Sequence, residues 1–210
     1  MAERHLTTIV KDLQATLDEL AGADLHPVLD AELAEVLISL VAVGSRVEAA
    51  TARVAAAVDT SKVWANDRSV SCPAWLARVA NRDRSECARL VALGRSLRSM
   101  PAVETAFLAG ELSTRHVRLL ARAAERAPEN FANDEAWLVG RARQLRFPAF
   151  VRVVRYWEQC AAPDQAEDDA LARYRRRSLK LSGGEHGTGL LDVEFEPIGY
   201  ATFAEGLRRI

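Results

Sequence analysis

Residues 71–127 read SCPAWLARVANRDRSECARLVALGRSLRSMPAVETAFLAGELSTRHVRLLARAAERA, which is the stretch with the clearest helix punctuation and the densest positive charge. Twice a short apolar helix pattern enters a tight connection and restarts on a capping residue, first at Asp83 and then at Ser113. A side-chain oxygen at a helix start accepts from a backbone N–H that has no helical partner, so each restart predicts a helix N-terminus. Two helices joined by about three residues form a helix-turn-helix outline, which makes nucleic acid a candidate ligand.

The helix predicted after Ser113 carries a row of arginines. Arg115, Arg118, Arg122 and Arg126 fall at i, i+3, i+7 and i+11, so helical periodicity places them on one face. Guanidinium groups in such a row can bind phosphates bidentately. The alternative is a solvated surface on which arginines pair with nearby acids. The candidate acids are Glu86, Glu104, Glu111 and Glu125.

The DNA-binding hypothesis assigns phosphate contacts to six arginines of this stretch. They are Arg82, Arg84, Arg89, Arg115, Arg118 and Arg122. Contacts of this kind position a duplex without reading its base sequence. The formal net charge of the whole chain is −1, yet residues 61–157 hold 17 bases against nine acids, whereas residues 1–60 hold four against ten. This asymmetry is expected if only the middle of the chain faces an anion, and it predicts weak, salt-sensitive binding.

Three motifs of the same stretch carry a family resemblance: SCPAWLA, then LVALGRSLRSMPAVETAFLAGELS, then TRHVRLLARAA. Together they resemble the domain of unknown function 222 family, also called the 13E12 repeat family, and the similarity extends more loosely from about residue 29 to the C-terminus. The resemblance implies the N-terminal helical region of an HNH endonuclease-like protein, which stands in front of a nuclease domain and has no established role of its own. It therefore implies a DNA-related context.

Hydrophobic periodicity predicts a mainly α fold, a multi-helix bundle. Outside the central stretch, we expect helices at about residues 4–21, 30–60, 135–145 and 148–162. Near the C-terminus, SLKLS and GLLDVEFE flank GGEHGT and alternate in polarity, which predicts one β-hairpin.

We expect two domains. Residues 1–162 form a helical domain, and residues 163–210 form a helix, the hairpin and the start of a further helix. Because Ile210 falls inside that last helical pattern, we expect a chain truncated before a nuclease domain, or a shortened family member.

The helix predicted at residues 30–60 would be about 45 Å long, which is more than a small bundle requires. It is interpreted either as a central helix around which the core packs or as part of a dimer interface. The second interpretation gives an alternative function: a protein-interaction or oligomerisation module without direct nucleic-acid contact, homo-oligomeric through this helix.

The sequence holds no recognisable catalytic motif. An HNH site needs a histidine base, an asparagine and a second His or Asn around a divalent metal, and His5, His26, His116 and His186 lack such neighbours. We expect no catalytic residue, metal ligand or cofactor in this chain, with a divalent metal only if an HNH domain follows. A Ser–His–Asp or a Cys–His arrangement stays open, and with it enzyme activity.

The remaining composition points to a reduced, cytoplasmic protein. Cys72, Cys87 and Cys160 form no CxxC pair, which argues against a disulfide framework or a zinc site. No signal peptide pattern is present. No window reaches about 18 consecutive apolar residues, so we expect no membrane span.

Overall fold

The computed structural model describes residues 5–26, 28–163, 171, 174–175, 177–183, 188–195 and 197–209. It confirms a mainly α fold with a single small hairpin in this part of the chain. The first elements are α1 (Leu6–Ala21), α2 (Asp30–Ser61), the 3₁₀ helix η1 (Val63–Asp67), α3 (Cys72–Val79), α4 (Arg84–Leu97) and α5 (Pro101–Leu108). They are followed by α6 (Thr114–Arg126), α7 (Pro128–Gln144), α8 (Phe147–Ala161), β1 (Ser178–Gly183), β2 (Gly189–Glu194) and α10 (Pro197–Arg208).

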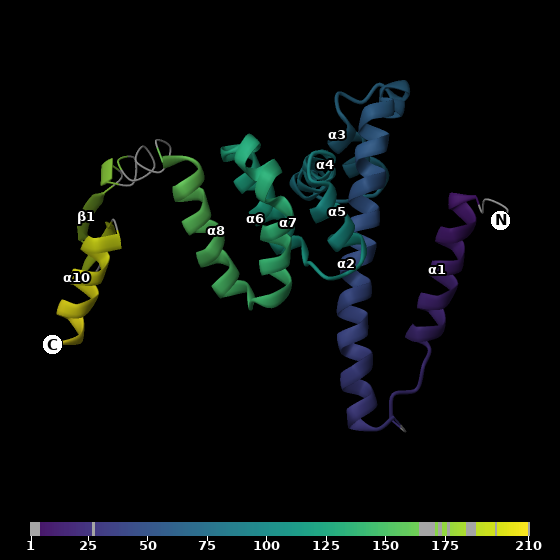
Figure 1. Cartoon of the computed structure of the whole chain (residues 1–210), viewed down its shortest axis with the longest axis horizontal. Coiled ribbons are helices and arrows are strands. Elements are labelled where there is room, and N and C mark those ends of the chain that lie inside the picture. The colour runs from purple at the N-terminus through teal and green to yellow at the C-terminus, as the bar shows by residue number, and fades with distance from the viewer. Residues whose placement is uncertain are drawn as a thin grey trace.

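Helices α3 to α8 gather along one side of α2 and form the helical body (Figure 1). Its core is built from almost fully buried apolar residues of α2, of α4 to α8 and of the connections between them, and their spacing gives each helix an inward stripe. The largest of these side chains are Phe107, Phe131, Phe150, Leu97, Met100, Leu112, Leu120 and Leu138. A second, smaller cluster around Ala55, Cys72 and Val91 joins α2, α3 and α4.

α2 and α4 cross at very short range. The residues of α2 that are buried at the crossing are alanines, among them Ala52 and Ala56. α4 presents Gly94, where an added Cβ would clash with the carbonyl oxygen of Ala52 and lie 2.9 Å from the carbonyl carbon of that residue and 3.0 Å from the Cβ of Ala56. Small residues on both helices are what allow two backbones to approach this closely.

Two arginines of α4 fasten the same crossing at its edge. Arg95 donates from Nε and Nη2 to the carboxylate of Asp59 over 2.7 and 2.8 Å, and this bidentate contact lowers the pKa of the Asp59 carboxyl. Arg98 donates to the hydroxyl of Thr60 over 2.8 Å. Both arginines therefore bind residues of α2, and neither is among the six arginines to which phosphate contacts are assigned.

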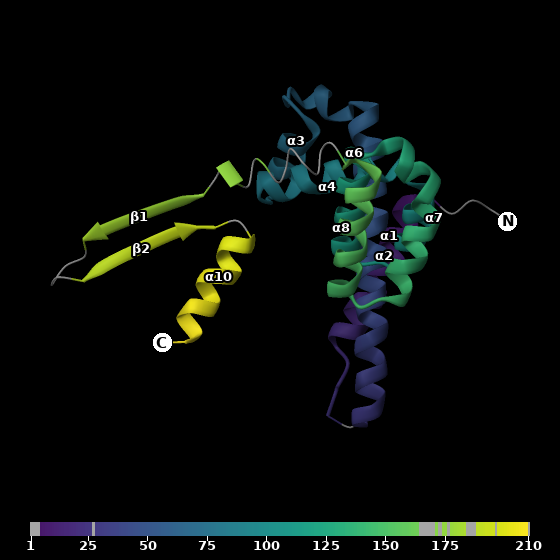
Figure 2. The same cartoon turned by 60° about the vertical axis from the view of Figure 1, so that its left-hand side comes forward.

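The long helix α2 has the predicted bounds, but it contributes buried residues to the core over only half its length. Its buried residues, Ala49, Ala52, Ala55 and Ala56, all belong to the C-terminal half. Between Asp30 and Glu48 no residue is buried. The N-terminal half extends beyond the helical body, and α1 runs in the opposite direction on the side of α2 away from that body (Figures 1 and 2).

One predicted boundary was wrong. The polar run after Pro128 was expected to be a connection leading to a helix at about residue 135, but α7 begins at Pro128 itself. Proline fits the first helical turn, where its missing N–H has no acceptor to lose, and Glu129 complements the positive end of the helix dipole. Phe131 then packs in the core, so tertiary burial makes this polar stretch helical.

The C-terminal segment contains the predicted hairpin. β1 and β2 are antiparallel, with Leu179 opposite Val193 and Leu181 opposite Leu191 on one face. The ring of Phe195 lies 4.9 Å from that of Phe203 in α10. The turn at 184–187, which includes His186, and most of the helix predicted after Pro163 lie outside the described residues.

Candidate nucleic-acid interface

The connection before α6 is pressed against α2. Gly110 has φ +80°, a left-handed conformation that favours glycine. A Cβ there would lie 2.9 Å from the carbonyl oxygen of Ala42 and 3.0 Å from Cγ of Arg46, so a larger residue does not fit. The hydroxyl of Thr114, the first residue of α6, donates to the carboxylate of Glu48. These contacts to α2 fix where α6 begins.

The start of α6 is capped by Ser113, as the sequence predicts, in a capping box that His116 completes. The Ser113 hydroxyl lies 2.8 Å from Nδ1 of His116, and the Ser113 backbone N–H donates to the same nitrogen over 3.3 Å. The His116 ring packs edge-on against Phe147, with 4.9 Å between the ring centroids. Burial lowers the pKa of His116 and keeps the imidazole neutral, so Nδ1 remains an acceptor. In this arrangement the Ser–His pair serves as a helix cap.

α6 separates an apolar side from an arginine side. Val117 and Leu120 are fully buried, whereas Arg115, Arg118 and Arg122 are exposed. The fourth member of the predicted row differs, because Nη1 of Arg126 lies 3.7 Å from the carboxylate of Glu158. In the described structure, the arginines of this row that have no acidic partner are therefore the first three.

α8 adds an arginine that the sequence pattern did not single out. Arg115 lies over the ring of Phe147, 5.0 Å from its centroid, and Arg126 pairs with Glu158, so α6 and α8 lie side by side and run in the same direction. Both of these α8 residues lie on the edge that faces α6. Arg155 is three residues before Glu158 and eight after Phe147, which places it beside this edge, about 60–80° around α8, and it is exposed.

We call the surface formed by Arg115, Arg118, Arg122 and Arg155 the α6–α8 arginine face. Arg152, also exposed, lies one turn before Arg155 on α8. Only the tertiary packing of α8 against α6 shows that Arg155 belongs to this face.

The other three predicted arginines form a separate group at the start of α4. Asp83 caps this helix by accepting from the backbone N–H groups of Ser85 and Glu86 over 2.9 and 3.0 Å. Hydrogen bonds from the Ser85 hydroxyl and the Glu86 backbone lower the pKa of the Asp83 carboxyl. Arg82, Arg84 and Arg89 are all exposed around this cap.

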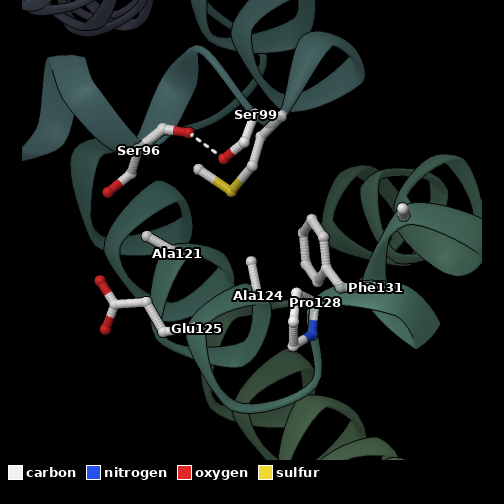
Figure 3. Close-up of a pocket in the computed structure, with 9 residues that line it drawn as sticks. Ser96, Ser99, Ala121, Ala124, Glu125, Pro128 and Phe131 are labelled. Atoms are coloured by element: carbon white, nitrogen blue, oxygen red, sulfur yellow. Dashed lines mark hydrogen bonds between the residues drawn. The ribbon is translucent and has the colours of Figure 1, made fainter.

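The two arginine groups belong to different elements, one around the start of α4 and one on α6. α4 approaches α6 at the carboxyl end of each helix, where Ser96 and Ser99 lie opposite Ala121 and Glu125 (Figure 3). Ser96 comes twelve positions after Arg84 and seven after Arg89, which is about 18 and 10 Å of helix. The six predicted arginines are thus divided into an α4 group and an α6 group.

Acid pairing does not account for the predicted arginines. Within residues 5–26 and 28–163, no carboxylate forms an ion pair with Arg82, Arg84, Arg89, Arg115, Arg118 or Arg122. Two of the acids considered as partners bind other arginines instead. Glu104 lies 3.7 Å from Arg53, and Glu111 lies 2.6 Å from Arg143.

A hollow of about 170 Å³ lies where α4, α6 and α7 meet (Figure 3). Met100, Pro128 and Phe131 give it an apolar lining, the Ser99 hydroxyl donates to the carbonyl of Ser96, and Glu125 contributes a carboxylate. An acidic, mostly apolar hollow is not suited to phosphate, so the candidate interface is the α6–α8 arginine face.

Neither a metal cluster nor a membrane span is found in the described part of the chain. No group of three or more His, Cys, Asp or Glu residues there is arranged to hold a metal ion. Likewise, none of the helices described is long and apolar enough to cross a bilayer.

Comparison with known proteins gives one match. A family model described as a domain of unknown function (DUF222) matches residues 10–210. No curated protein and no solved structure matches the chain.

Proposed function

The chain belongs to the DUF222 family, and we propose that its helical body is a non-catalytic module that binds and positions duplex DNA. The observation that carries this proposal is the α6–α8 arginine face, whose α6 residues are exposed and have no acidic partner in the described structure. The sequence resemblance supports it, because it implies an HNH nuclease domain beside this region in relatives. There the module would hold the nuclease near its substrate.

The spacing of the arginines suits a phosphate backbone. Arg115 and Arg122 are seven residues apart, or about 10 Å along α6. Phosphates of one strand recur every ~3.4 Å along the duplex axis, so a row of this length can contact phosphates of a single strand. Arg155 widens the row from the neighbouring helix. The contacts fix the position of the duplex and carry no base-sequence information.

The experiment measures affinity for duplex DNA at about 50 and 200 mM salt. We expect wild type to bind at the lower salt concentration and an Arg115/Arg118/Arg122→Ala variant to bind much more weakly. The matched control is Arg82/Arg84/Arg89→Ala, which removes equal charge from the α4 group and tests whether that group contributes. If wild type and the α6 variant bind equally poorly, the proposal is wrong.

A second candidate function is favoured by a different observation. α1 and the N-terminal half of α2, residues 5–47, expose fifteen large apolar side chains and bury none. Such a surface marks an interaction site in soluble proteins, which supports a protein-interaction or oligomerisation module independent of DNA. Light scattering over a range of concentrations tests the homo-oligomeric form, and a monomer throughout would remove it.

A further inference from the structure

The N-terminal half of α2 carries a heptad seam. Leu29, Leu33, Val36, Leu40, Val43 and Val47 are spaced 4, 3, 4, 3 and 4 residues apart, which is the a and d pattern of helices that pack along their length. Val43 and Val47 are each nine residues before a buried alanine, Ala52 and Ala56. Nine residues are two and a half helical turns, so the seam lies on the side of α2 opposite the helical body.

α1 carries a matching stripe. Leu6, Ile9, Val10, Leu13, Leu17 and Leu20 lie on one side of the helix, and all six are exposed. Its acids, Asp12, Asp18 and Glu19, lie off this stripe. An isolated helix of this length is marginal in water and depends on packing of its apolar face. The structure provides no such packing, because α1 has no buried residue.

Both stripes are wider than a two-helix contact requires. A pair of helices uses only positions a and d, whereas a helix in a bundle adds e or g because it faces more than one neighbour. In α2, with Leu33, Leu40 and Val47 at position a, Leu37 is an additional apolar residue at e. In α1, with Leu6 and Leu13 at position a, Val10 and Leu17 are additional apolar residues at e. α1 and the N-terminal half of α2 are therefore patterned as two helices of a larger bundle.

We propose that a second copy of this chain supplies the other two helices. Two arms, each made of α1 and the N-terminal half of α2, would then pack into a four-helix bundle. This inference rests on the second candidate function and names its partner. The arm is self-complementary: α1 is about 24 Å long, and the seam at residues 29–47 is about 28 Å long. Two copies related by a twofold axis thus bring four apolar stripes of similar length together.

The charges of the arm also bear on the partner. Residues 5–48 hold two basic and eight acidic side chains, and the acids of α1 lie away from the apolar stripe. In a dimer they face solvent and repel one another across the two copies. Salt screens such repulsion, so self-association should strengthen as salt is raised. A basic partner protein would bind the same arm more weakly in salt.

The test is sedimentation equilibrium of the full chain, because the seam lies outside the core and its variants should leave the body folded. We expect wild type to dimerise more tightly as salt is raised, and Leu40→Asp or Leu13→Asp to weaken dimerisation by about 100-fold or more, since each change enters the bundle twice. Two controls add the same charge off the stripes. They are Ile38→Asp, at a site 71% exposed on α2, and Ala15→Asp on α1, and both should still dimerise.

The possible outcomes separate the inference from the function on which it rests. A wild-type monomer at every concentration overturns both the homo-oligomeric module and the bundle. A dimer that Leu40→Asp breaks but Leu13→Asp does not contradicts only the four-helix arrangement, because α1 would then take no part. A dimer weakened equally by Ile38→Asp shows that the contact lies elsewhere. Wild-type dimerisation that weakens with salt contradicts the like-charged arrangement.

Discussion

Replacing Gly94 by alanine tests the crossing that positions the arginine-bearing helices. The added methyl would lie 2.9 Å from the carbonyl carbon of Ala52 and 3.0 Å from the Cβ of Ala56, in contact with backbone that cannot rotate away. Overpacking of this kind costs about 1–3 kcal/mol or more. Removing a glycine from a helix interior returns about 1 kcal/mol. Because the carbonyl oxygen of Ala52 lies closer still to the added methyl, the upper end of the overpacking range applies, and we expect a net loss of about 2 kcal/mol in the free energy of unfolding.

The matched control is Gly140→Ala in α7, where nothing lies within 4 Å of the added Cβ. With propensity gained and no clash, this variant should be more stable by about 0.5–1 kcal/mol. Urea unfolding followed by far-ultraviolet circular dichroism measures both changes, and we expect opposite signs. A Gly94→Ala protein as stable as wild type would refute the close α2–α4 crossing.

Three further predictions concern polar contacts of the body. Glu135 is buried and accepts from the backbone N–H of Val103 over 2.9 Å, so Glu135→Ala should lower the unfolding free energy by about 1–3 kcal/mol and Glu135→Gln, which keeps an acceptor, by less, as measured by urea unfolding. His116 has a lowered pKa in the folded chain, so the unfolded chain binds the proton more readily; the urea midpoint should fall as pH drops from about 7.5 to 5.5, and should fall less in His116→Gln. Asp59→Asn removes the bidentate acceptor of Arg95, whose side chain is half exposed, and should lower the thermal midpoint by a few degrees, about 1 kcal/mol; a midpoint within error of wild type would show that this contact adds no stability.

Local pattern predicted the elements whose signals are contained in their own residues. The bounds of α2 followed from uninterrupted periodicity, and the hairpin followed from alternation around a glycine-rich turn. The start of α7 at Pro128 could not be predicted in this way, because its polar first turns become helical through the burial of Phe131 against α8, where the ring of Trp157 lies 6.0 Å away. The apolar breadth of α2 was visible, but not that alanines would face the body.

The candidate site shows the same limit. The spacing of Arg115, Arg118 and Arg122 fixes their common side of α6 without any tertiary information. The position of Arg155 beside them depends on α8 running along α6, and the separation of the α4 group depends on where the two helices meet. Arg95 and Arg98 bind residues 36 and 38 positions earlier in the chain, and no local spacing indicates such contacts.

The central claim is that the α6–α8 arginine face binds the DNA backbone, and the salt dependence of binding tests it most directly. Each phosphate contact adds about 0.9 to the slope of log K against log salt concentration. We predict that Arg118/Arg122/Arg155→Ala lowers the magnitude of the wild-type slope by about 2.7, the share of three contacts. An unchanged slope in this variant, with measurable binding by wild type, would contradict the claim.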